Sequence, residues 1–298
     1  MGTLTKRPYD RKKFTMISQE WEPTDQDLFI RRPYETELAD STLYEKLPEW
    51  LANWKCNYET VGFDRTIEDL PRIEGLALVV DNSMTGSLDR HIEALKKFKG
   101  TILACDRAAW KLCAHGIAPD IVGNVDSSFL CIPFVDNPEV RKYMDRIHGV
   151  FASTANPLTI RAFSGRRHFF QPYLGYPLTD SLAAKGRLPV MSSGGCIHNT
   201  LWILAVNLKA TSIGLMGIDN SYTKYGETEY PGIKHKIVEN QYGKFYVDPV
   251  YEHYNDILLK YAKFAREKHG IRTVNCNKGG VLYGNGIEDM SLEEFAGG

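Results

Sequence analysis

Short apolar runs alternate with helix-like segments from residue 75 to the end of the chain. The runs predict strands buried on both faces, because each is short, continuous and rich in aliphatic side chains. They are LALVV (76–80), TILAC (101–105), DIVGNVD (120–126), GVFAS (149–153), HFF (168–170), SIGLMGID (212–219) and RTVNC (272–276). Helical spacing of apolar residues lies between them, over 88–98, 107–116, 157–163, 196–210 and 250–269, and SLEEF predicts a terminal helix. This alternation predicts parallel strands joined by right-handed crossovers, and therefore a doubly wound, mostly parallel, Rossmann-like α/β fold.

The first 70 residues differ from the rest of the chain in composition and in hydrophobic pattern. They are rich in charged and aromatic side chains, and prolines such as Pro33 and Pro48 interrupt any long periodic element. We expect an N-terminal helical appendage over 1–70, with short helices such as 41–54. Residues 71–298 form the main domain, in which the aromatic and glycine-rich stretch 220–248 predicts an insertion or a lid over the site.

Composition narrows the class of protein. The chain has 36 basic and 37 acidic residues, so its net charge is close to zero. A chain with this charge has no overall electrostatic attraction to nucleic acid or to an anionic membrane. Its six cysteines show no C-x-x-C pairing and are expected to be reduced core residues. The first residues carry no apolar leader, and no later run approaches the length of a membrane span. We therefore expect a cytoplasmic protein that acts on a small molecule, with a homo-oligomer possible.

Each strong strand of the predicted sheet is followed by polar residues. Ligands of open parallel sheets bind beyond the carboxyl ends of the strands, where loops and helix starts converge. Candidate binding residues at these ends are Asp81, Asn82, Ser83 and Ser87 after the first strand, Asp106 after the second, Asn124, Asp126 and Ser127 after the third, and Asp219 after SIGLMGI. The sequence thus predicts one polar site along this edge of the sheet.

Three aspartates in the segment CDRAAWKLCAHGIAPDIVGNVDSS are the candidate catalytic residues. Asp106 and Asp126 end neighbouring strands, so their carboxylates are expected side by side, as an oxygen-rich site that suits Mg²⁺. Asp120 begins the third strand. Asp106 can instead cap the following helix, and Asp120 can instead cap a turn after Pro119, since aspartate favours both places. For Asp126 the site interpretation is favoured, because it follows a buried strand and precedes no clear helix.

The segment SSGGCIHNT is a second candidate site. Small residues at Ser193, Gly194 and Gly195 let a ligand approach the backbone, and the first turn of the next helix offers free N–H groups to a phosphate. His198 and Asn199 lie in that turn. An ordinary capped helix with glycines for tight packing accounts for the segment equally well. The P-loop, zinc-protease, serine-hydrolase and dinucleotide-binding motifs do not occur in the sequence.

These segments together resemble a known family. ILACDRAAWKLCAHGIAPDIVGNVDSS, SSGGCIHNTLWILAVNLKATSIGLMGIDNSY and NCNKGGVLYGNGI resemble the domain shared by archaeal 6-hydroxymethyl-7,8-dihydropterin pyrophosphokinases (MptE-like) and flagellar motility accessory factors, over roughly residues 64–290. The aspartate-bearing segment is also similar to that of thiamine pyrophosphokinases, in which such aspartates serve Mg-ATP. The family's G-x-G-P-S-L loop is replaced here by DNSMTGSL, which keeps Ser87 and Leu88.

The resemblance implies a Mg²⁺-dependent pyrophosphokinase that uses ATP as co-substrate and a hydroxymethyl pterin as acceptor. It carries Asp106, Asp120 and Asp126 over as metal and phosphate residues. The flagellar members are similar to sialyltransferase-like enzymes, so a glycosyltransferase that uses a nucleotide sugar is the alternative, with Tyr222, Tyr225, Tyr230 and Tyr242 as a stacking platform for a sugar or a pterin. The changed DNSMTGSL loop keeps a third hypothesis open, a non-catalytic nucleotide-binding protein.

Overall fold

The computed structural model describes residues 33–84, 86–174, 178–225, 234–284 and 286–297. Within these ranges, nine strands form one parallel sheet, and two more form a separate antiparallel hairpin. The strands are β1 Leu76–Val80, β2 Thr101–Cys105, β3 Ile121–Asn124, β4 His148–Ala152, β5 Arg166–Pro172, β6 Val190–Met191, β7 Ser212–Met216, β8 Lys236–Asn240, β9 Gly243–Val247, β10 Arg272–Asn275 and β11 Ile287–Asp289. The α-helices are α3 Pro33–Thr60, α4 Ile92–Leu95, α5 Asp106–Ala114, α6 Ile132–Val135, α7 Pro138–Arg141, α8 Pro157–Ala162, α9 Leu178–Gly186, α10 Ile197–Asn207, α11 Pro249–His269 and α12 Leu292–Gly297. Short 3₁₀ turns are η2 Ile67–Asp69, η3 Leu88–His91 and η4 Phe129–Cys131.

The strand order of the sheet is β11-β10-β7-β1-β2-β3-β4-β5-β6, and every neighbouring pair is parallel. The chain therefore builds outward from β1 to β6 and then returns to the other side of β1 with β7. Right-handed crossovers in opposite directions put their helices on opposite faces of the sheet. This is the doubly wound fold that the sequence predicts, and its topological switch point lies between β1 and β7.

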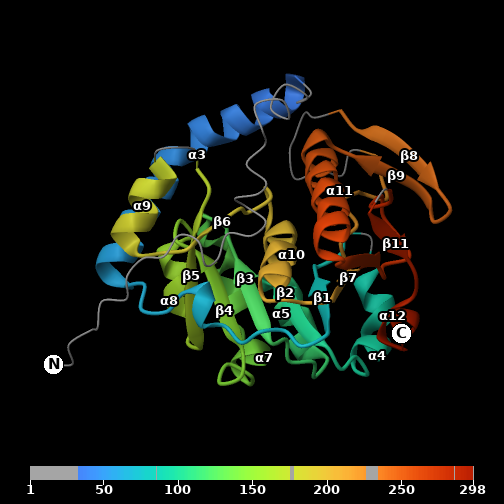
Figure 1. Ribbon diagram of the computed structural model, residues 1–298, viewed down its shortest axis with the longest axis horizontal. Helices are drawn as coiled ribbons and strands as arrows, with labels where there is room; N and C mark the ends of the chain where they lie inside the picture. The colour runs from blue at the N-terminus through green and yellow to red at the C-terminus, as the bar shows by residue number, and fades with distance from the viewer. Residues whose placement is uncertain (1–32, 85, 175–177, 226–233, 285, 298) are drawn as a thin grey trace.

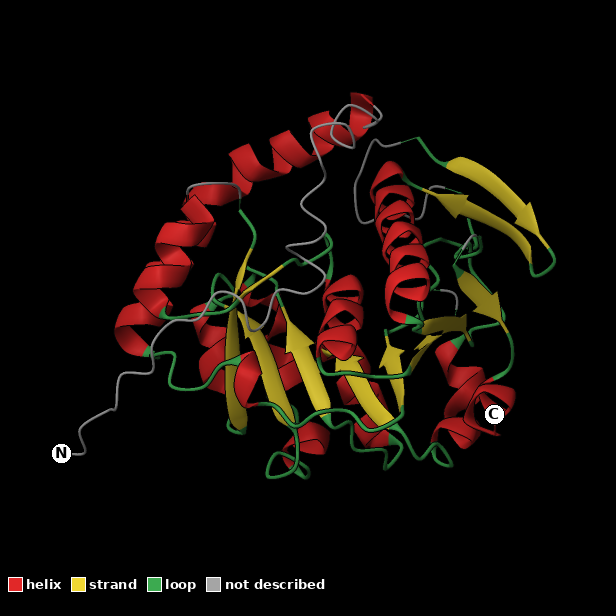
Figure 2. Ribbon diagram, viewed as in Figure 1, coloured by secondary structure: helices red, strands yellow, loops and turns green. Residues whose placement is uncertain are grey.

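Helices cover both faces of the sheet (Figure 1 and Figure 2). α10 and α11 lie in front of it in this view, whereas α5 lies behind β2 and β3. The core is continuous across these layers, and Trp202 of α10 is fully buried, with its indole nitrogen donating to Thr273 Oγ1 at 3.1 Å. None of the helices in the described ranges has the length and apolar character that a membrane crossing requires.

Gly123 shows why α10 lies so close to the sheet. A Cβ on Gly123 in β3 would come within 2.7 Å of Leu201 Cδ2 and 2.8 Å of Ile197 Cδ1. Real Cβ atoms do not approach neighbours this closely, so a larger residue at position 123 would require Leu201 and Ile197 of α10 to shift. The start of α10 is thereby held against the end of β3, next to Asn124.

In the described part of the predicted appendage, one long helix takes the place of the short helices expected around 41–54. α3 runs for 28 residues with Pro48 inside it. A proline inside a helix removes one main-chain hydrogen bond and bends the helix without always ending it, and α3 is visibly curved (Figure 1). Contacts near the end of α3 explain why the helix continues past Pro48. Trp54 Nε1 donates to Gln171 Oε1 at 3.0 Å, and Asn57 Nδ2 donates to the carbonyl of Ala155 at 2.8 Å. α3 thus packs over the carboxyl ends of β4 and β5.

The predicted insertion contains the β8–β9 hairpin. The hairpin projects beside α11 and β11 in Figure 1, and Asn240 Nδ2 donates to the carbonyl of Gly280 at 2.9 Å. These contacts place it over the β10 and β11 side of the sheet. The described part of 220–248 thus has an insertion of its own, and the expectation of a lid over the site stays a prediction.

Candidate functional site

The carboxyl ends of β1, β2 and β3 and the start of α10 converge next to the switch point. Asp81 follows β1, Asp106 follows β2, Asn124 ends β3, and His198 lies in the first turn of α10. Each lies at the end of an apolar strand or at the start of an apolar helix. The packing of these elements in the core therefore fixes the positions of the four polar residues. The structure thus brings together four of the residues that the sequence singles out.

Asp106 is the first residue of α5 and is held by two donors. Its Oδ1 accepts from the main-chain nitrogen of Arg107 at 2.6 Å, and its Oδ2 accepts from Asn124 Nδ2 at 2.6 Å. Burial raises the pKa of the Asp106 carboxyl, and the charge of Asp81 acts in the same direction, whereas hydrogen bonds from Cys131, Asn124 and Arg107 act against them. A buried carboxylate under these conditions favours a nearby cation.

Asn124 adds an unsatisfied oxygen to this place. Its side chain is 1% exposed, and Oδ1 has no hydrogen-bond partner among the described residues. A buried acceptor without a donor costs free energy, and such an atom in a native site calls for a ligand. An amide oxygen beside a carboxylate suits either a hard cation or an N–H donor.

Asp126 lies in the loop after β3 and is exposed. Its Oδ1 accepts from the main-chain nitrogen of Ser128 at 2.7 Å. The loop is held from outside, because Asn156 Nδ2 and Asn53 Nδ2 donate to the carbonyl of Ser127 at 2.9 and 3.3 Å. Ser127 is buried and contributes its main chain to this support, so the expectation that it binds a ligand stays a prediction.

Asp120 lies at the start of the third strand, as the sequence predicts, and therefore away from the other two aspartates. It immediately precedes β3 and therefore lies at the amino end of the strand, across the sheet from Asp106 and Asp126. Its Oδ2 accepts from the main-chain nitrogen of Ile102 at 2.8 Å, and its carbonyl accepts from His148 N at 2.9 Å. Asp120 thus joins the beginnings of β2, β3 and β4, in line with the alternative that it shapes the turn.

The buried His198 pairs with the half-buried Asp81. His198 Nδ1 lies 2.8 Å from Asp81 Oδ2, and the other carboxylate oxygen accepts from the main chain of Asn82 at 2.7 Å. Burial acts to raise the pKa of Asp81, but His198 outweighs it and the pKa is lowered. Burial likewise opposes the charged ring, yet Cys196 and Asp81 raise the pKa of His198 to about 10. Asp81 and Cys196 thus favour the protonated ring, and the Asp81 carboxylate that lies against it balances its charge.

The segment before α10 is shaped by glycines with left-handed backbone. Gly194 has φ of 58° and Gly195 has φ of 86°, and a Cβ on Gly195 would meet the ring of Tyr254 at 3.0 Å. Asn199 Nδ2 donates to the carbonyl of Gly194 at 2.7 Å, so Asn199 holds the turn. Among the described residues, no side chain caps the N-terminus of α10, which leaves its first N–H groups available to an anion.

The polar residues of the DNSMTGSL loop bind one another. Ser83 Oγ and Ser87 Oγ both donate to the Asp219 carboxylate at 2.7 Å, and Asn277 Nδ2 also donates to it. Asn277 Oδ1 accepts from the main chain of Gly217 at 2.8 Å. This network ties the loops after β1, β7 and β10 together. The sequence predicts Ser83, Ser87 and Asp219 as cofactor-binding residues, and their side chains instead serve this internal network.

The aromatic residues of the insertion are largely engaged in packing. Tyr222 is 2% exposed and donates to Asp248 Oδ2 at 3.0 Å, and Tyr242 stacks on Tyr283. Tyr225 is 69% exposed, and Tyr230 lies outside the described residues. The expected stacking platform is therefore reduced to Tyr225 among the described tyrosines of the set.

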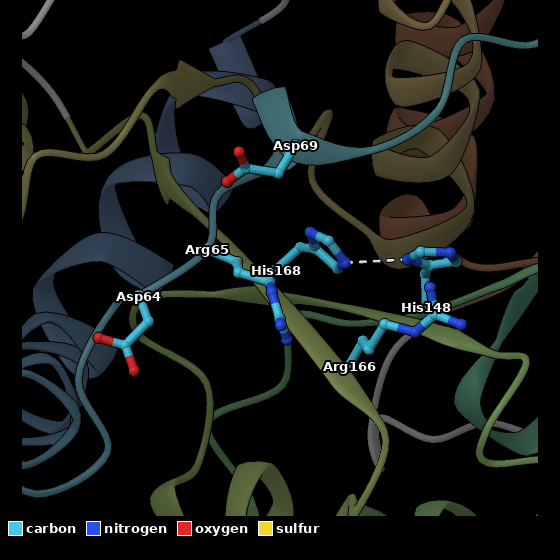
Figure 3. Close-up of a pocket in the computed structure, with 6 residues that line it drawn as sticks. All are labelled: Asp64, Arg65, Asp69, His148, Arg166 and His168. Atoms are coloured by element: carbon cyan, nitrogen blue, oxygen red, sulfur yellow. Dashed lines mark hydrogen bonds between the residues drawn. The ribbon is translucent and has the colours of Figure 1, made fainter. Parts of the chain in front are cut away.

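A separate pocket of about 380 Å³ lies at the opposite edge of the sheet (Figure 3). Its lining residues are Asp64, Arg65, Asp69, His148, Arg166 and His168. His148 Nδ1 lies 2.9 Å from His168 Nε2, and His168 Nδ1 donates to the carbonyl of Thr66 at 3.1 Å. The pocket belongs to the amino ends of β4 and β5, so it is distinct from the convergence at β1, β2 and β3.

The donor set at the carboxyl edge suits Mg²⁺. Within the described ranges, no three His, Cys, Asp or Glu side chains gather as a ready-made metal site. Magnesium is commonly held by one or two carboxylates, with water and substrate phosphates completing the shell. Asp106, the unpartnered Asn124 Oδ1 and the exposed Asp126 supply oxygen donors of that kind.

Comparison with known proteins identifies the family of the chain. The family model described as 6-hydroxymethylpterin diphosphokinase MptE-like matches residues 64–225, more than half of the chain. The chain belongs to this family. The match confirms the resemblance that the GIAPDIVGNVD and GGCIHNT motifs indicate. No curated protein matches the chain.

A solved structure supports the fold of this MptE-like protein. The MAf glycosyltransferase from Magnetospirillum magneticum AMB-1 matches 76% of the chain with a TM-score of 0.57 and 17% identity. The chain spans 35% of that protein, so about two thirds of the larger chain has no counterpart here. At this identity the likeness establishes a shared fold. A diphosphokinase and a glycosyltransferase are both transferases, so the family and the structural neighbour agree at that level.

Sequence reasoning does not find every residue of this region. The sequence predicts Cys196 as a core residue, yet it is partly exposed and its Sγ lies 3.1 Å from His198 Nε2. Asn53 and Asn57 of α3 support the strand ends from a segment that lies outside the family motifs. The C-x-H spacing in GGCIHNT is a sequence signal for the contact between Cys196 and His198. The role of Asn53 and Asn57 depends on how α3 docks, for which the sequence gives no signal.

Proposed function

We propose that this protein is a Mg²⁺-dependent diphosphotransferase that moves pyrophosphate from ATP to the hydroxymethyl group of a small heterocycle, 6-hydroxymethyl-7,8-dihydropterin. The observation that carries the proposal is the buried, unpartnered Asn124 Oδ1 beside the Asp106 carboxylate. The family description names a diphosphokinase of this substrate class. ATP enters as co-substrate and Mg²⁺ as cofactor.

The arrangement of charge supports this chemistry. Asp106, Asn124 and Asp126 would hold the metal, which neutralises phosphate charge when it is bound. The uncapped start of α10 would face the phosphates with main-chain N–H donors. Gly194 and Gly195 permit the left-handed backbone that leads into this helix start. The protein's part is thus mostly positioning and electrostatic stabilisation, as phosphoryl transfer requires.

The test is turnover of ATP and 6-hydroxymethyl-7,8-dihydropterin, followed as AMP release with and without Mg²⁺. The Asp126→Asn variant is expected to lose at least about a hundredfold in turnover, because it removes an oxygen charge that would hold the metal. Asp120→Asn is the matched control, since Asp120 lies at the far edge of the sheet and asparagine keeps an acceptor for Ile102 N. Equal turnover of Asp126→Asn and wild type would contradict the proposal.

A glycosyltransferase that uses a nucleotide sugar is the second candidate. It is favoured by the fold shared with the MAf glycosyltransferase and by the exposed Tyr225, which can stack on a sugar. The same strand ends would then hold the nucleotide. Hydrolysis or transfer of a cytidine or uridine diphospho-sugar, with ATP inactive, would favour this candidate over the first.

A further inference from the structure

Cys196, His198 and Asp81 form a continuous chain of polar contacts. Cys196 Sγ lies 3.1 Å from His198 Nε2, and His198 Nδ1 lies 2.8 Å from Asp81 Oδ2. A thiol, an imidazole and a carboxylate in this order are the components of a nucleophile that is activated by a base and oriented by an acid. The three residues come from two distant parts of the chain, which only the fold brings together.

The surroundings hold the imidazole in the orientation that such a base requires. His198 is 4% exposed, and the half-buried Asp81 carboxylate fixes Nδ1 as a donor, so Nε2 faces the sulfur. Asn220 Nδ2 donates to Asn255 Oδ1 at 2.8 Å and lies 3.4 Å from His198 Nε2. The ring therefore has little freedom to turn away from Cys196.

The sulfur is reachable and lies beside main-chain donors. Of the six cysteines, Cys56 and Cys196 are partly exposed and the other four are buried. Cys196 is the residue before the first turn of α10, where no described side chain caps the N–H groups. Main-chain donors at a helix start can stabilise an oxyanion that forms on a carbon bonded to the sulfur.

We propose that Cys196 is a covalent nucleophile toward activated acyl esters. Cys196 Sγ attacks the carbonyl carbon, and the hydrogen shared between Sγ and Nε2 rests on His198. A sulfur–carbon bond forms, the carbon–oxygen bond of the ester breaks, and His198 returns the proton to the leaving oxygen. Water then hydrolyses the thioester and restores the thiol. This activity shares the start of α10 with the proposed diphosphotransfer but uses none of the residues proposed to hold the metal.

The test uses p-nitrophenyl acetate as the acyl ester and the full-length protein. Wild type is expected to release a burst of p-nitrophenol and to gain one acetyl group, mapped by peptide mass spectrometry to Cys196. Cys196→Ala is expected to lose both. Cys56→Ala is the matched control, because Cys56 is also partly exposed but its sulfur neighbours Thr60 and not a histidine, so this variant keeps the full rate.

The base is tested with two variants. His198→Gln is expected to slow acetylation at least about a hundredfold, which is the usual contribution of a positioned base. Asp81→Asn, which keeps an oxygen acceptor, is expected to slow it about tenfold or more while it preserves the fold, and melting curves verify folding of both. Acetylation of Cys56 as fast as Cys196, or a folded Asp81→Asn protein with the wild-type rate, would overturn the proposal.

Discussion

Individual residues at the carboxyl edge differ in how many of their polar atoms have a hydrogen-bond partner. Ser83, Ser87 and Asp219 satisfy one another, whereas Asn124 keeps a buried oxygen without a donor among the described residues. Asp106 bonds Asn124 and lies in a place where burial raises its carboxyl pKa. Asn199 in the first turn of α10 also keeps an oxygen without a donor among the described residues, so we centre the candidate site on Asp106, Asn124 and this helix start.

The His148–His168 pair predicts a stability that depends on pH. Burial lowers the pKa of both rings, and nearby arginines act in the same direction. Their folded pKa values thus lie below the unfolded value, so the stabilisation is complete above about pH 6.5 and is lost as the pH falls from there through the folded values. We expect urea unfolding to give a smaller free energy of unfolding at about pH 5 than at about pH 7.

The variant His168→Gln separates this effect from general acid destabilisation. It removes one titrating ring, so its free energy of unfolding should change less over the same pH range. His115→Gln, in the exposed turn that ends α5, is the control and should follow wild type. An acid-induced loss in His168→Gln as large as in wild type would show that this pair is not the source of the pH dependence.

Among the elements, α3 supports the loops that carry the site. Its Asn57 donates to the carbonyls of Ser153 and Ala155 at 3.0 and 2.8 Å, and its Asn53 donates to the carbonyl of Ser127. The loop with Asp126 and the loop after β4 are thereby joined through one helix. Secure docking of α3 is accordingly a condition for a rigid candidate site.

Asn57→Ala tests that docking. The change leaves two carbonyls without their donor in a place where Asn57 is fully buried, and we expect a loss of about 2 kcal/mol or more in the free energy of unfolding. Urea denaturation measures it. Lys55→Ala, on the exposed face of the same helix, should be close to neutral. Equal stability of the two variants would show that α3 is not held by these contacts.

Across the whole molecule, the sequence predicts the sheet better than its edges. LALVV and TILAC lie in the core on both faces, so their pattern is unambiguous, and β1 and β2 have the expected bounds. β6 and β11 have two and three residues, too few for a periodic signal, and β8 alternates on a surface hairpin. Strand ends can be predicted from this pattern, which explains why the sequence identifies Asp106 and Asn124.

Features that depend on tertiary contacts cannot be predicted in this way. α3 persists through Pro48 because Trp54 and Asn57 dock on distant strands. The family resemblance groups Asp120 with Asp106 and Asp126, although Asp120 begins the third strand in the apolar pattern and lies just before β3, at the other edge of the sheet. The closed network of Ser83, Ser87 and Asp219 depends on Asn277, which lies 58 residues from Asp219 in the chain.

A thermal-shift panel tests whether the ends of β1, β2 and β3 form a site for a Mg²⁺-bound nucleotide. ATP, AMP, GTP, CMP, UDP and 6-hydroxymethyl pterin are each measured with and without Mg²⁺, because a ligand that binds only the folded state raises Tm. Mg-ATP is expected to raise the Tm of wild type and Asp120→Asn but not that of Asp126→Asn. No shift with Mg-ATP in wild type, or an equal shift in Asp126→Asn, would contradict the assignment of this site.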